Sequence, residues 1–353
     1  MITAESSTTM KAFMLHGQGD LRAHDLKLPI VSSGHVLLRV KRAGICGSDI
    51  HYYSHGRSGS FVPKQPLVLG HEFAGEVVSV GEGVDRSMLG QRVTVDPSIP
   101  CGMCKFCRGG RYNLCRHMRY YGSASCDPHI NGGFAEYVVA PVVNCLRVPD
   151  SLSWGEAAMI EPLSVAVHAA FRAGSVAGRR VLVTGGGTIG QLMALVTRAF
   201  GATQVVVSDI TDYPRWLAIT LGADAALDAT DLNFKTKAIS LSQGGFDLVF
   251  EASGSVEALS QAIAAAERGA TIVQVGTLPA TVMAPLNLIM TKELSLVGSF
   301  RFANVFATSL DLAVSRRVNL EPLISAVFSL ADTQKAMELA ISKDEIVKIQ
   351  IEP

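Results

Sequence analysis

Four cysteines stand close together in this chain of 353 residues. Cys101, Cys104, Cys107 and Cys115 follow the spacing C-x2-C-x2-C-x7-C. Four thiolates in one short loop fill the tetrahedral shell of a zinc ion and leave no position for a substrate, so we expect a structural site. The ferredoxin pattern begins alike but continues with x3 and Cys-Pro, which is absent here, so zinc is favoured over an iron–sulfur cluster.

Other potential metal ligands are spread along the first half of the chain. Cys46 stands in Gly-Ile-Cys-Gly-Ser-Asp, while His71 and Glu72 follow a glycine and Glu161 precedes Pro-Leu. Each of these signals is weak alone, because a lone cysteine is usually a small buried hydrophobe and a lone glutamate is usually exposed. Only their joint arrangement is informative.

A glycine-rich run carries Gly185, Gly187 and Gly190 in the spacing G-x-G-x-x-G. It follows an apolar strand and opens a helix expected at Ile189 to Phe200, the context in which this motif binds a dinucleotide. The first glycine permits the tight turn, the second lets the backbone approach the pyrophosphate, and the third allows close helix–strand packing. The helix N-terminus attracts the anion. Further candidate cofactor contacts are Thr188, Ile189, Val275 and Ser299.

The strand after this helix ends at Asp209, close to the expected position ~20 residues downstream. Its carboxylate can accept hydrogen bonds from both adenosine ribose hydroxyls and would repel a 2′-phosphate, which favours NAD over NADP. Arg215 comes shortly afterwards and could weaken that preference. We therefore expect NAD as the cofactor and keep NADP as the alternative.

Two domains are expected from the pattern of apolar segments. Residues 1–156 read as short β segments broken by Gly and Pro, for example at His35 to Arg42, which indicates a compact β-rich domain. Over residues 157–299, apolar strands alternate with helices, which indicates a doubly wound parallel sheet covered on both faces. Residues 300–353 add helices and a short strand at Val347 to Ile351. The expected fold class is α/β.

Composition is that of a globular protein, with 48% apolar and 18% charged residues. Lys plus Arg equals Asp plus Glu at 31 each, so charge gives no reason to expect a nucleic-acid or membrane partner. The uncharged stretch Gly269 to Thr291 contains prolines, so we expect a strand and a loop there rather than a membrane helix. The Ser/Thr-rich start lacks a cationic and apolar signal, and we expect a cytoplasmic protein.

Taken together, the motifs closely resemble those of the zinc-dependent medium-chain alcohol dehydrogenases, over essentially residues 11–353. Within that family the chain looks most like the polyol branch, which contains sorbitol dehydrogenase and L-idonate 5-dehydrogenase. The matching segments are Gly-Ile-Cys-Gly-Ser-Asp-Ile-His-Tyr-Tyr at 44–53, Gly-His-Glu at 70–72, Glu-Pro-Leu-Ser-Val at 161–165 and Gly-Ser-Phe-Arg-Phe at 298–302. The resemblance implies a GroES-like catalytic domain that carries the structural zinc lobe (1–156), a Rossmann NAD-binding domain (157–299) and a segment returning to the catalytic domain (300–353).

The resemblance also implies a catalytic zinc held by Cys46, His71 and Glu72, with Glu161 beside it. Glu161 stands where many alcohol dehydrogenases have a second cysteine. In the polyol branch this glutamate hydrogen-bonds the water on the metal and can move onto the metal, so Glu72, Glu161 or both are candidate ligands. Asp49 is implied to orient the zinc-binding histidine.

The implied reaction is oxidation of a secondary alcohol by hydride transfer to NAD, with zinc acting as a Lewis acid. Ser48 and His51 would relay the proton towards solvent. Tyr52 and Arg301 match residues that contact the hydroxylated chain in sorbitol dehydrogenases. The segment that contains His129 looks like that of bacterial L-idonate 5-dehydrogenases. His129 could therefore bind a sugar-acid carboxylate, or it could only order its own loop.

We expect oxidation of L-idonate to 5-ketogluconate, with a sorbitol- or xylitol-type polyol dehydrogenase as the alternative. A hypothesis of another class is a non-catalytic zinc- and NAD-binding sensor, which would bind NAD without turnover. The presence of Cys46, Ser48, His51 and His71 argues against the sensor hypothesis, because a protein without catalytic activity would not need all four side chains. The family resemblance also suggests a homo-oligomer, either a dimer or a tetramer.

Overall fold

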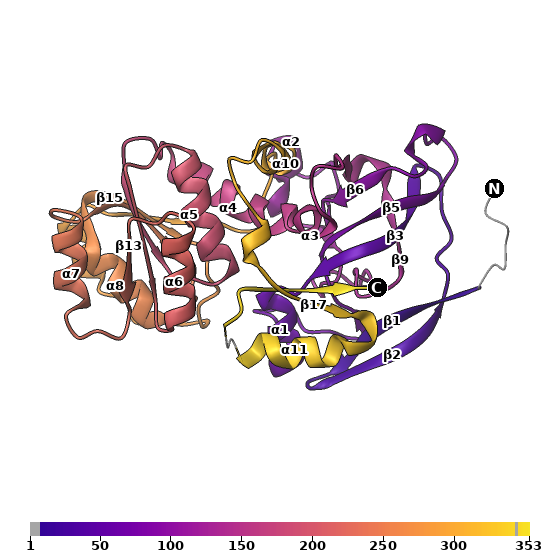
Figure 1. Cartoon of the computed structure of the whole chain (residues 1–353), viewed down its shortest axis with the longest axis horizontal. Coiled ribbons are helices and arrows are strands. Elements are labelled where there is room, and N and C mark those ends of the chain that lie inside the picture. Colours follow the sequence, from indigo (N-terminus) through magenta and orange to yellow (C-terminus); the bar gives the residue numbers. More distant parts are fainter. Residues whose placement is uncertain (1–7, 343–344) are drawn as a thin grey trace. The chain divides into compact units, whose positions relative to one another are not determined.

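The computed structural model describes residues 8–342 and 345–353, which form two compact units. The first unit contains residues 8–161, 320–342 and 348–353, and the second contains residues 162–319 and 345–347 (Figure 1). The boundary after residue 161 falls within α4 (Ile160–Ala173), a helix that begins in one unit and continues in the other. Residues 300–319 belong to the second unit, so the chain returns to the first unit later than the sequence suggested.

Short strands dominate the first unit, as the sequence predicts. Its largest sheet has the order β10-β6-β5-β3-β18-β17, with β9 also paired to β3, and smaller sheets are β2-β1-β4 and β7-β8. The strands are β1 (Thr9–Gly17), β2 (Asp20–Lys27), β3 (His35–Gly44), β4 (Leu67–Val68), β5 (Glu72–Val80), β6 (Arg92–Val95), β7 (Ser98–Ile99), β8 (Arg119–Tyr120), β9 (Tyr137–Pro141), β10 (Cys145–Arg147), β17 (Ile324–Ser329) and β18 (Lys348–Glu352).

The C-terminal strand is an inner strand of that sheet. β18 runs parallel to β17 and antiparallel to β3, with Gln350 opposite Gly44. Apolar residues of the paired strands, such as Leu38 in β3 and Ile351 in β18, are buried. The last residues of the chain therefore help to form the core beside the segment that carries Cys46.

The second unit contains a parallel sheet of six strands in the order β13-β12-β11-β14-β15-β16. The strands are β11 (Arg180–Thr184), β12 (Gln204–Asp209), β13 (Ala225–Asp228), β14 (Phe246–Glu251), β15 (Ala266–Gln274) and β16 (Ser295–Gly298). Helices α5 and α6 cover one face and α7 and α8 the other (Figure 1). Near-continuous Val, Leu and Ile runs suit strands buried on both faces, and the doubly wound sheet is confirmed.

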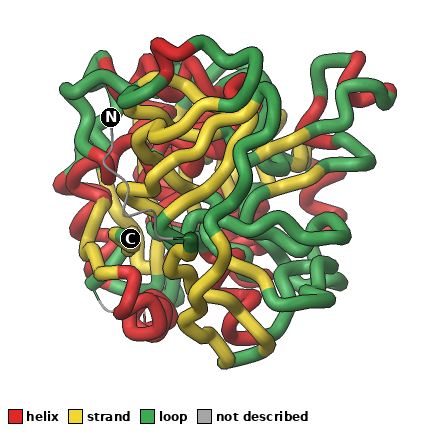
Figure 2. Tube along the Cα trace, turned by 90° about the vertical axis from the view of Figure 1, so that its right-hand side faces the viewer, coloured by secondary structure: helices red, strands yellow, loops and turns green. Residues whose placement is uncertain are grey.

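Helices and loops complete both units, and loops take up much of the chain (green in Figure 2). The helices besides α4 are α1 (Gly47–His55), α2 (Lys105–Arg108), α3 (Trp154–Ala158), α5 (Thr188–Ala199), α6 (Asp212–Thr220), α7 (Phe234–Leu241), α8 (Val256–Ala265), α9 (Leu286–Thr291), α10 (Phe306–Val314) and α11 (Thr333–Ser342). The uncharged stretch 269–291 forms the end of β15, a loop and the short α9. Within the described part of the chain, no helix is long and apolar enough to cross a membrane.

Candidate active site and metal centres

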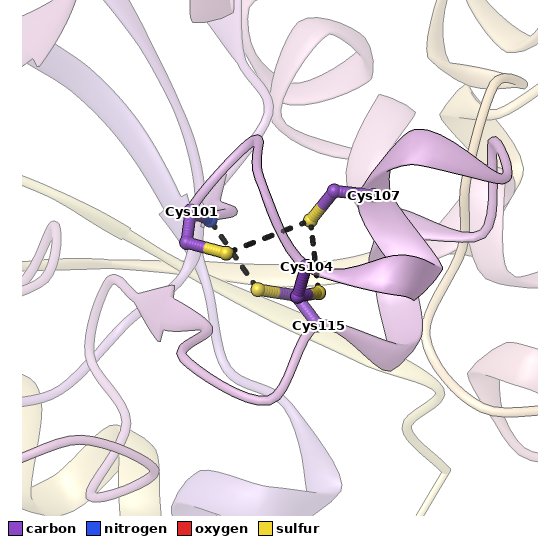
Figure 3. Close-up of side chains that lie close together, drawn as sticks. All are labelled: Cys101, Cys104, Cys107 and Cys115. Carbon is purple, nitrogen blue, oxygen red and sulfur yellow. Dashed lines mark hydrogen bonds between the residues drawn. The ribbon is translucent and has the colours of Figure 1, made fainter.

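The cysteine lobe of the first unit brings four sulfur atoms together (Figure 3). Those of Cys101, Cys104, Cys107 and Cys115 all lie within 4.8 Å of one another. The Cys104 and Cys107 sulfurs are 3.5 Å apart and the Cys101 and Cys107 sulfurs 4.0 Å apart, and all these thiols are free. Sulfurs around a tetrahedral zinc lie about 3.8 Å apart for a Zn–S distance of about 2.3 Å. The donor set therefore fits zinc.

Hydrogen bonds from backbone N–H groups favour the ionised form of Cys104, one of the four lobe cysteines. Hydrogen bonds from the N–H groups of Cys107 and Arg116 lower the pKa of the Cys104 thiol to about 6. Burial and the hydrogen bond with Cys104 instead raise the pKa of Cys107 to about 12. Neighbouring thiolates oppose one another's ionisation, so a bound dication is what would let all four ionise together.

A second cluster of potential ligands lies in the first unit. One donor atom from each of Cys46, His71 and Glu72 lies within 4.8 Å of the other two. Antiparallel pairing of Gly44 with Glu72 sets the end of β3 beside the start of β5, and Cys46 follows directly. A Cβ on Gly44 would collide with the Glu72 carboxylate, so the glycine makes room for it. Sulfur, nitrogen and carboxylate oxygen are the donors that zinc accepts in catalytic sites, and the cluster fits that ion.

Asp49 supports this cluster from the first turn of α1. It is fully buried, its Oδ2 accepts the Cys46 N–H at 2.9 Å, and its Oδ1 accepts the Gly70 N–H at 3.4 Å. The same Oδ1 lies 3.8 Å from His71 Nδ1, a buried atom that has no hydrogen-bond partner within the described residues. Burial, with Glu72 and Asp49 beside it, raises the pKa of the Cys46 thiol to about 12, so a thiolate there needs a cation. Asp49 therefore lies beside His71 without a hydrogen bond to it, and its orienting role stays a prediction.

Glu161 is buried beside the cluster at the start of α4. Its Oε1 accepts a hydrogen bond of 2.8 Å from the Tyr120 hydroxyl. Burial raises the pKa of Glu161 to about 8 against the lowering effect of His71, and Glu72 adds to the rise. Of the two glutamates left open by the sequence, Glu72 is the one whose oxygen groups with Cys46 and His71 among the described residues.

Two site residues were missed by the sequence analysis, namely Tyr120 and Lys348. Lys348 Nζ donates to Glu72 Oε2 at 2.6 Å and to the Ile45 carbonyl at 2.9 Å. Both side chains of this ion pair are almost fully buried. No local motif marks either residue, because each reaches its partner only when segments distant in the sequence fold together.

Helix α1 carries three of the residues assigned from the sequence. Ser48 is half-buried, and His51 is exposed, with its Nδ1 3.4 Å from Nδ1 of His55. Tyr52 is buried, and its hydroxyl accepts the Ala124 N–H at 3.1 Å. The exposed imidazole suits release of a proton to solvent, whereas the Tyr52 hydroxyl is bound to the loop after β8.

His129 does not fit the expected substrate role, and that expectation is corrected. Its Nε2 accepts the Lys64 N–H at 2.9 Å, and its Nδ1 is hydrogen-bonded to the Cys126 carbonyl. With both ring nitrogens engaged by backbone groups, neither is left for a carboxylate. His129 therefore orders its loop, which is the simpler of the two roles considered.

The glycine motif of the second unit has the geometry that its spacing predicts. Gly185 has a φ of 90°, and a Cβ there would lie 2.8 Å from Ser253. A Cβ on Gly190 would collide with the Gly185 carbonyl oxygen, whereas one on Gly187 would meet nothing among the described residues within 4 Å. Gly187 precedes α5 and has no side chain to cap it, so the first N–H groups of α5 suit an anion.

The next two residues of the motif lie in the first turn of α5. The Thr188 hydroxyl donates to the Val347 carbonyl at 2.6 Å, which leaves its backbone N–H as the group that can contact a phosphate. Ile189 follows it in the same turn. Thr188 therefore ties the motif to the segment before β18.

Asp209 ends β12 beside the motif. Its Oδ2 accepts the Gly186 N–H at 2.7 Å and its Oδ1 accepts the Thr211 hydroxyl at 2.9 Å. The Arg215 guanidinium donates to the Asp209 carbonyl at 2.8 Å and pairs with Asp212 and, at 3.4 Å, with Asp228. The charge of Arg215 is therefore already balanced by carboxylates.

Val275, Ser299 and Arg301 also lie in the second unit. Val275 donates its N–H to the Glu251 carbonyl at 2.9 Å, and Ser299 donates its own to Gln274 at 2.9 Å. The Ser299 hydroxyl oxygen is buried without a hydrogen-bond partner among the described residues. Arg301 has a φ of 51°, in the left-handed region, and its guanidinium lies 5.0 Å from the Phe300 ring centre.

Comparisons with known proteins agree with this architecture. The family described as "Alcohol dehydrogenase GroES-like domain" matches residues 32–150, and "Zinc-binding dehydrogenase" matches residues 188–315. Sorbitol dehydrogenase of Bacillus subtilis is 35% identical over 98% of this chain and 97% of its own length. L-idonate 5-dehydrogenase (NAD(P)(+)) of Escherichia coli is 36% identical over 89% of this chain and 91% of its own length.

A solved structure gives the same result. The crystal structure of L-idonate 5-dehydrogenase from Escherichia coli covers 98% of both chains with a TM-score of 0.91 and 33% identity. Both units, the glycine motif and the zinc-type donor sets are thus accounted for by one family. The chain belongs to the zinc-dependent medium-chain alcohol dehydrogenases, in the polyol and sugar-acid branch, and is an NAD(P)-linked oxidoreductase that acts on CH–OH groups.

Proposed function

We propose that the chain oxidises a secondary hydroxyl of a sugar acid, with L-idonate as the first candidate and NAD as the acceptor. The observation that carries the proposal is the cluster of Cys46, His71 and Glu72 with Glu161 beside it. A polyol of the sorbitol or xylitol type is the alternative substrate. A sugar acid is favoured because an L-idonate 5-dehydrogenase is among the similar proteins, and Arg301 is the cation that the sequence resemblance assigns to the substrate.

Two zinc ions per chain are proposed. Cys101, Cys104, Cys107 and Cys115 would hold the structural ion, and Cys46, His71 and Glu72 the catalytic ion. When bound at the catalytic site, zinc supplies a Lewis acid that lowers the pKa of the substrate hydroxyl. The N–H hydrogen bonds to Cys104 and the carboxylate of Asp49 beside His71 support these ligand sets.

Residues of the chain would accept the proton of the substrate hydroxyl and pass it to solvent. Glu161 has a carboxylate whose second oxygen, Oε2, can take a proton while Tyr120 holds Oε1. Ser48 and His51 on α1 would pass a proton outwards, since His51 is exposed. Tyr52 would fix the loop that it binds and so shape the space for the hydroxylated chain.

NAD is proposed over NADP. Asp209 is the side chain expected at the adenosine ribose, where a carboxylate repels a 2′-phosphate. Arg215 is the nearby cation that could offset this repulsion, but its guanidinium is paired with Asp212 and Asp228. NAD supplies the hydride acceptor, and Gly185, Gly187, Thr188, Ile189, Gly190, Val275 and Ser299 would position it.

The proposal is tested by steady-state oxidation of L-idonate, D-gluconate, sorbitol and xylitol with NAD and with NADP. The highest kcat/KM is expected for L-idonate with NAD. An Arg301→Met variant should lose more of its kcat/KM with L-idonate than with sorbitol, because only the acid carries a carboxylate. A higher kcat/KM for sorbitol than for L-idonate would favour the alternative, and NAD binding without any turnover would favour a sensor.

Zinc content tests the two-ion proposal. Metal analysis of the wild type should give two zinc ions per chain, and Cys104→Ser should lower this by about one while lowering stability, because closed sites couple metal binding to folding. Iron in the wild type, or zinc at the catalytic cluster alone, would contradict the proposal.

A homo-oligomer, dimer or tetramer, is also proposed. β16 is an edge strand of the six-stranded sheet, and Leu296 within it is exposed. Met283, Leu286 and Met290 from the preceding segment are exposed apolar residues too. An uncovered edge strand with apolar side chains favours pairing with another copy. Light scattering should give a multiple of the chain mass, and Leu296→Glu should reduce that mass.

A cytoplasmic location of the protein stays a prediction.

A further inference from the structure

The cysteine lobe interrupts a small hairpin that leads into the candidate active site. Strands β7 and β8 pair antiparallel, with Ser98 opposite Tyr120 and Ile99 opposite Arg119. All four cysteines of the lobe lie in the segment between these strands. The lobe is therefore the loop of the hairpin whose second strand ends at Tyr120.

The lobe also packs against Tyr120. Cys115, Met118 and Tyr120 form a buried apolar cluster, and three further thiol side chains of the lobe pack against it, those of Cys101, Cys104 and Cys107. Cys115 and Met118 are 8% and 6% exposed, and Tyr120 is 4% exposed. The position of the tyrosine ring thus depends on the packing of the same loop that gathers the four sulfurs.

The other end of Tyr120 touches the catalytic cluster. Its hydroxyl donates to Glu161 Oε1 at 2.8 Å, and its ring centre lies 5.7 Å from that of His71. Among the described residues, this is the hydrogen bond that the Glu161 carboxylate receives. One side chain therefore connects the lobe with the carboxylate expected to act on the proton.

We propose that Tyr120 is a positioning residue through which the metal-loaded cysteine lobe sets the orientation of Glu161. The inference rests on the proposed roles of the lobe and of Glu161. An ion in the lobe fixes four points of the loop, which holds the Cys115–Met118–Tyr120 cluster and the Tyr120 hydroxyl in place. The hydroxyl occupies Oε1 and leaves Oε2 as the oxygen that can take a proton or approach the catalytic ion. The lobe thus acts on catalysis as well as on stability.

Tyr120→Phe tests the last link, because it removes only the hydroxyl. We expect kcat/KM to fall by roughly tenfold or more, the effect of losing one hydrogen bond to a charged group. The loss should fall mainly on kcat. In a Glu161→Gln background the same substitution should have little further effect, because the carboxylate it positions is already absent.

Tyr121→Phe is the matched control. Its hydroxyl also makes a hydrogen bond, a partly buried one of 2.7 Å, but to the Val139 carbonyl. Both variants should lose similar stability in urea unfolding, while only Tyr120→Phe should change kcat. Equal changes in kcat for the two variants would show a general packing effect and overturn the inference.

The link to the lobe is tested by Cys104→Ser and by Met118→Ala, which keeps all four cysteines. Each should lower kcat/KM in the wild type by an amount that shrinks several-fold in a Tyr120→Phe background, because both act through the same hydrogen bond. If Cys104→Ser does not fold, Met118→Ala still decides the question. Full additivity of the lobe variants with Tyr120→Phe would sink the proposal.

A readout that does not depend on turnover separates this inference from the proposed function. Cobalt(II) in place of zinc reports its surroundings through its visible absorption. Tyr120→Phe and Met118→Ala should both alter the spectrum of cobalt at the Cys46–His71–Glu72 site, and Tyr121→Phe should not. A wild type without dehydrogenase activity but with these spectral changes would refute only the proposed function. An active enzyme whose cobalt spectrum is unchanged by Tyr120→Phe would refute only the positioning role.

Discussion

Lys348 and Glu72 form a buried ion pair in the first unit, with 2.6 Å between Nζ and Oε2 and each side chain 2% exposed. The lysine comes from β18 near the C-terminus, and the glutamate from the start of β5. Lys348 also donates to the Ile45 carbonyl, next to Cys46. It therefore holds both segments that supply the candidate catalytic ligands.

Lys348→Met should be strongly destabilising. Removing one partner of a buried pair leaves an uncompensated charge, which costs about 3–5 kcal/mol. The measurement is urea unfolding of the zinc-free protein, with Lys348→Met/Glu72→Gln as the control. The double variant should recover most of the lost stability because it removes the unpaired charge. A single variant as stable as the wild type would mean that the pair does not contribute to folding.

Glu161→Gln should separate catalysis from metal retention. Glu72 groups with Cys46 and His71, so zinc occupancy should stay near the wild-type value without the Glu161 carboxylate. Loss of a positioned acid–base group should lower kcat/KM by roughly 10²-fold or more. His71→Ala, in contrast, should lose the catalytic ion in metal analysis. If Glu161→Gln emptied that site, Glu161 would be an obligatory ligand.

Asp209→Ser should shift cofactor use towards NADP. The substitution removes the carboxylate that would repel the 2′-phosphate and keeps a hydroxyl that can hydrogen-bond to the ribose. The ratio of kcat/KM for NAD to that for NADP should fall well below the wild-type ratio. Because Arg215 is paired with Asp212 and Asp228, Arg215→Met should change that ratio less. A wild type that prefers NADP would contradict the assignment.

The sequence predicted those parts of the site that local spacing encodes. The four lobe cysteines lie within fifteen positions of one another, so their spacing alone indicates a common ion. The three glycines of the cofactor motif lie in one short segment. In the structure, the atoms around Gly185 and Gly190 leave no room for a Cβ. Both predictions depend on short-range geometry, which residue order determines directly.

Partners that are distant in sequence could not be predicted in this way. Lys348 stands 276 positions from Glu72, and only the pairing of β18 with β3 brings them together. The imidazole of His129 is a group that can bind a carboxylate. The backbone N–H of Lys64, from another loop, however, already donates a hydrogen bond to it. Strand register determines which polar groups lie next to a side chain, and no short sequence motif encodes that register.

Asp96 provides a pH-dependent prediction outside both metal clusters. Burial raises its pKa from 3.8 to about 6, while hydrogen bonds from the Ser98 N–H and hydroxyl oppose the rise. Because the folded state holds this proton more tightly than the unfolded state, stability falls as pH rises from about 4 through about 6. Asp96→Asn keeps Oδ1 as an acceptor for the Ser98 N–H but cannot ionise. Urea unfolding should therefore show the variant gaining on the wild type between pH 4 and pH 7 and then levelling off. A stability difference that does not change with pH would mean that Asp96 ionises as readily in the folded as in the unfolded chain.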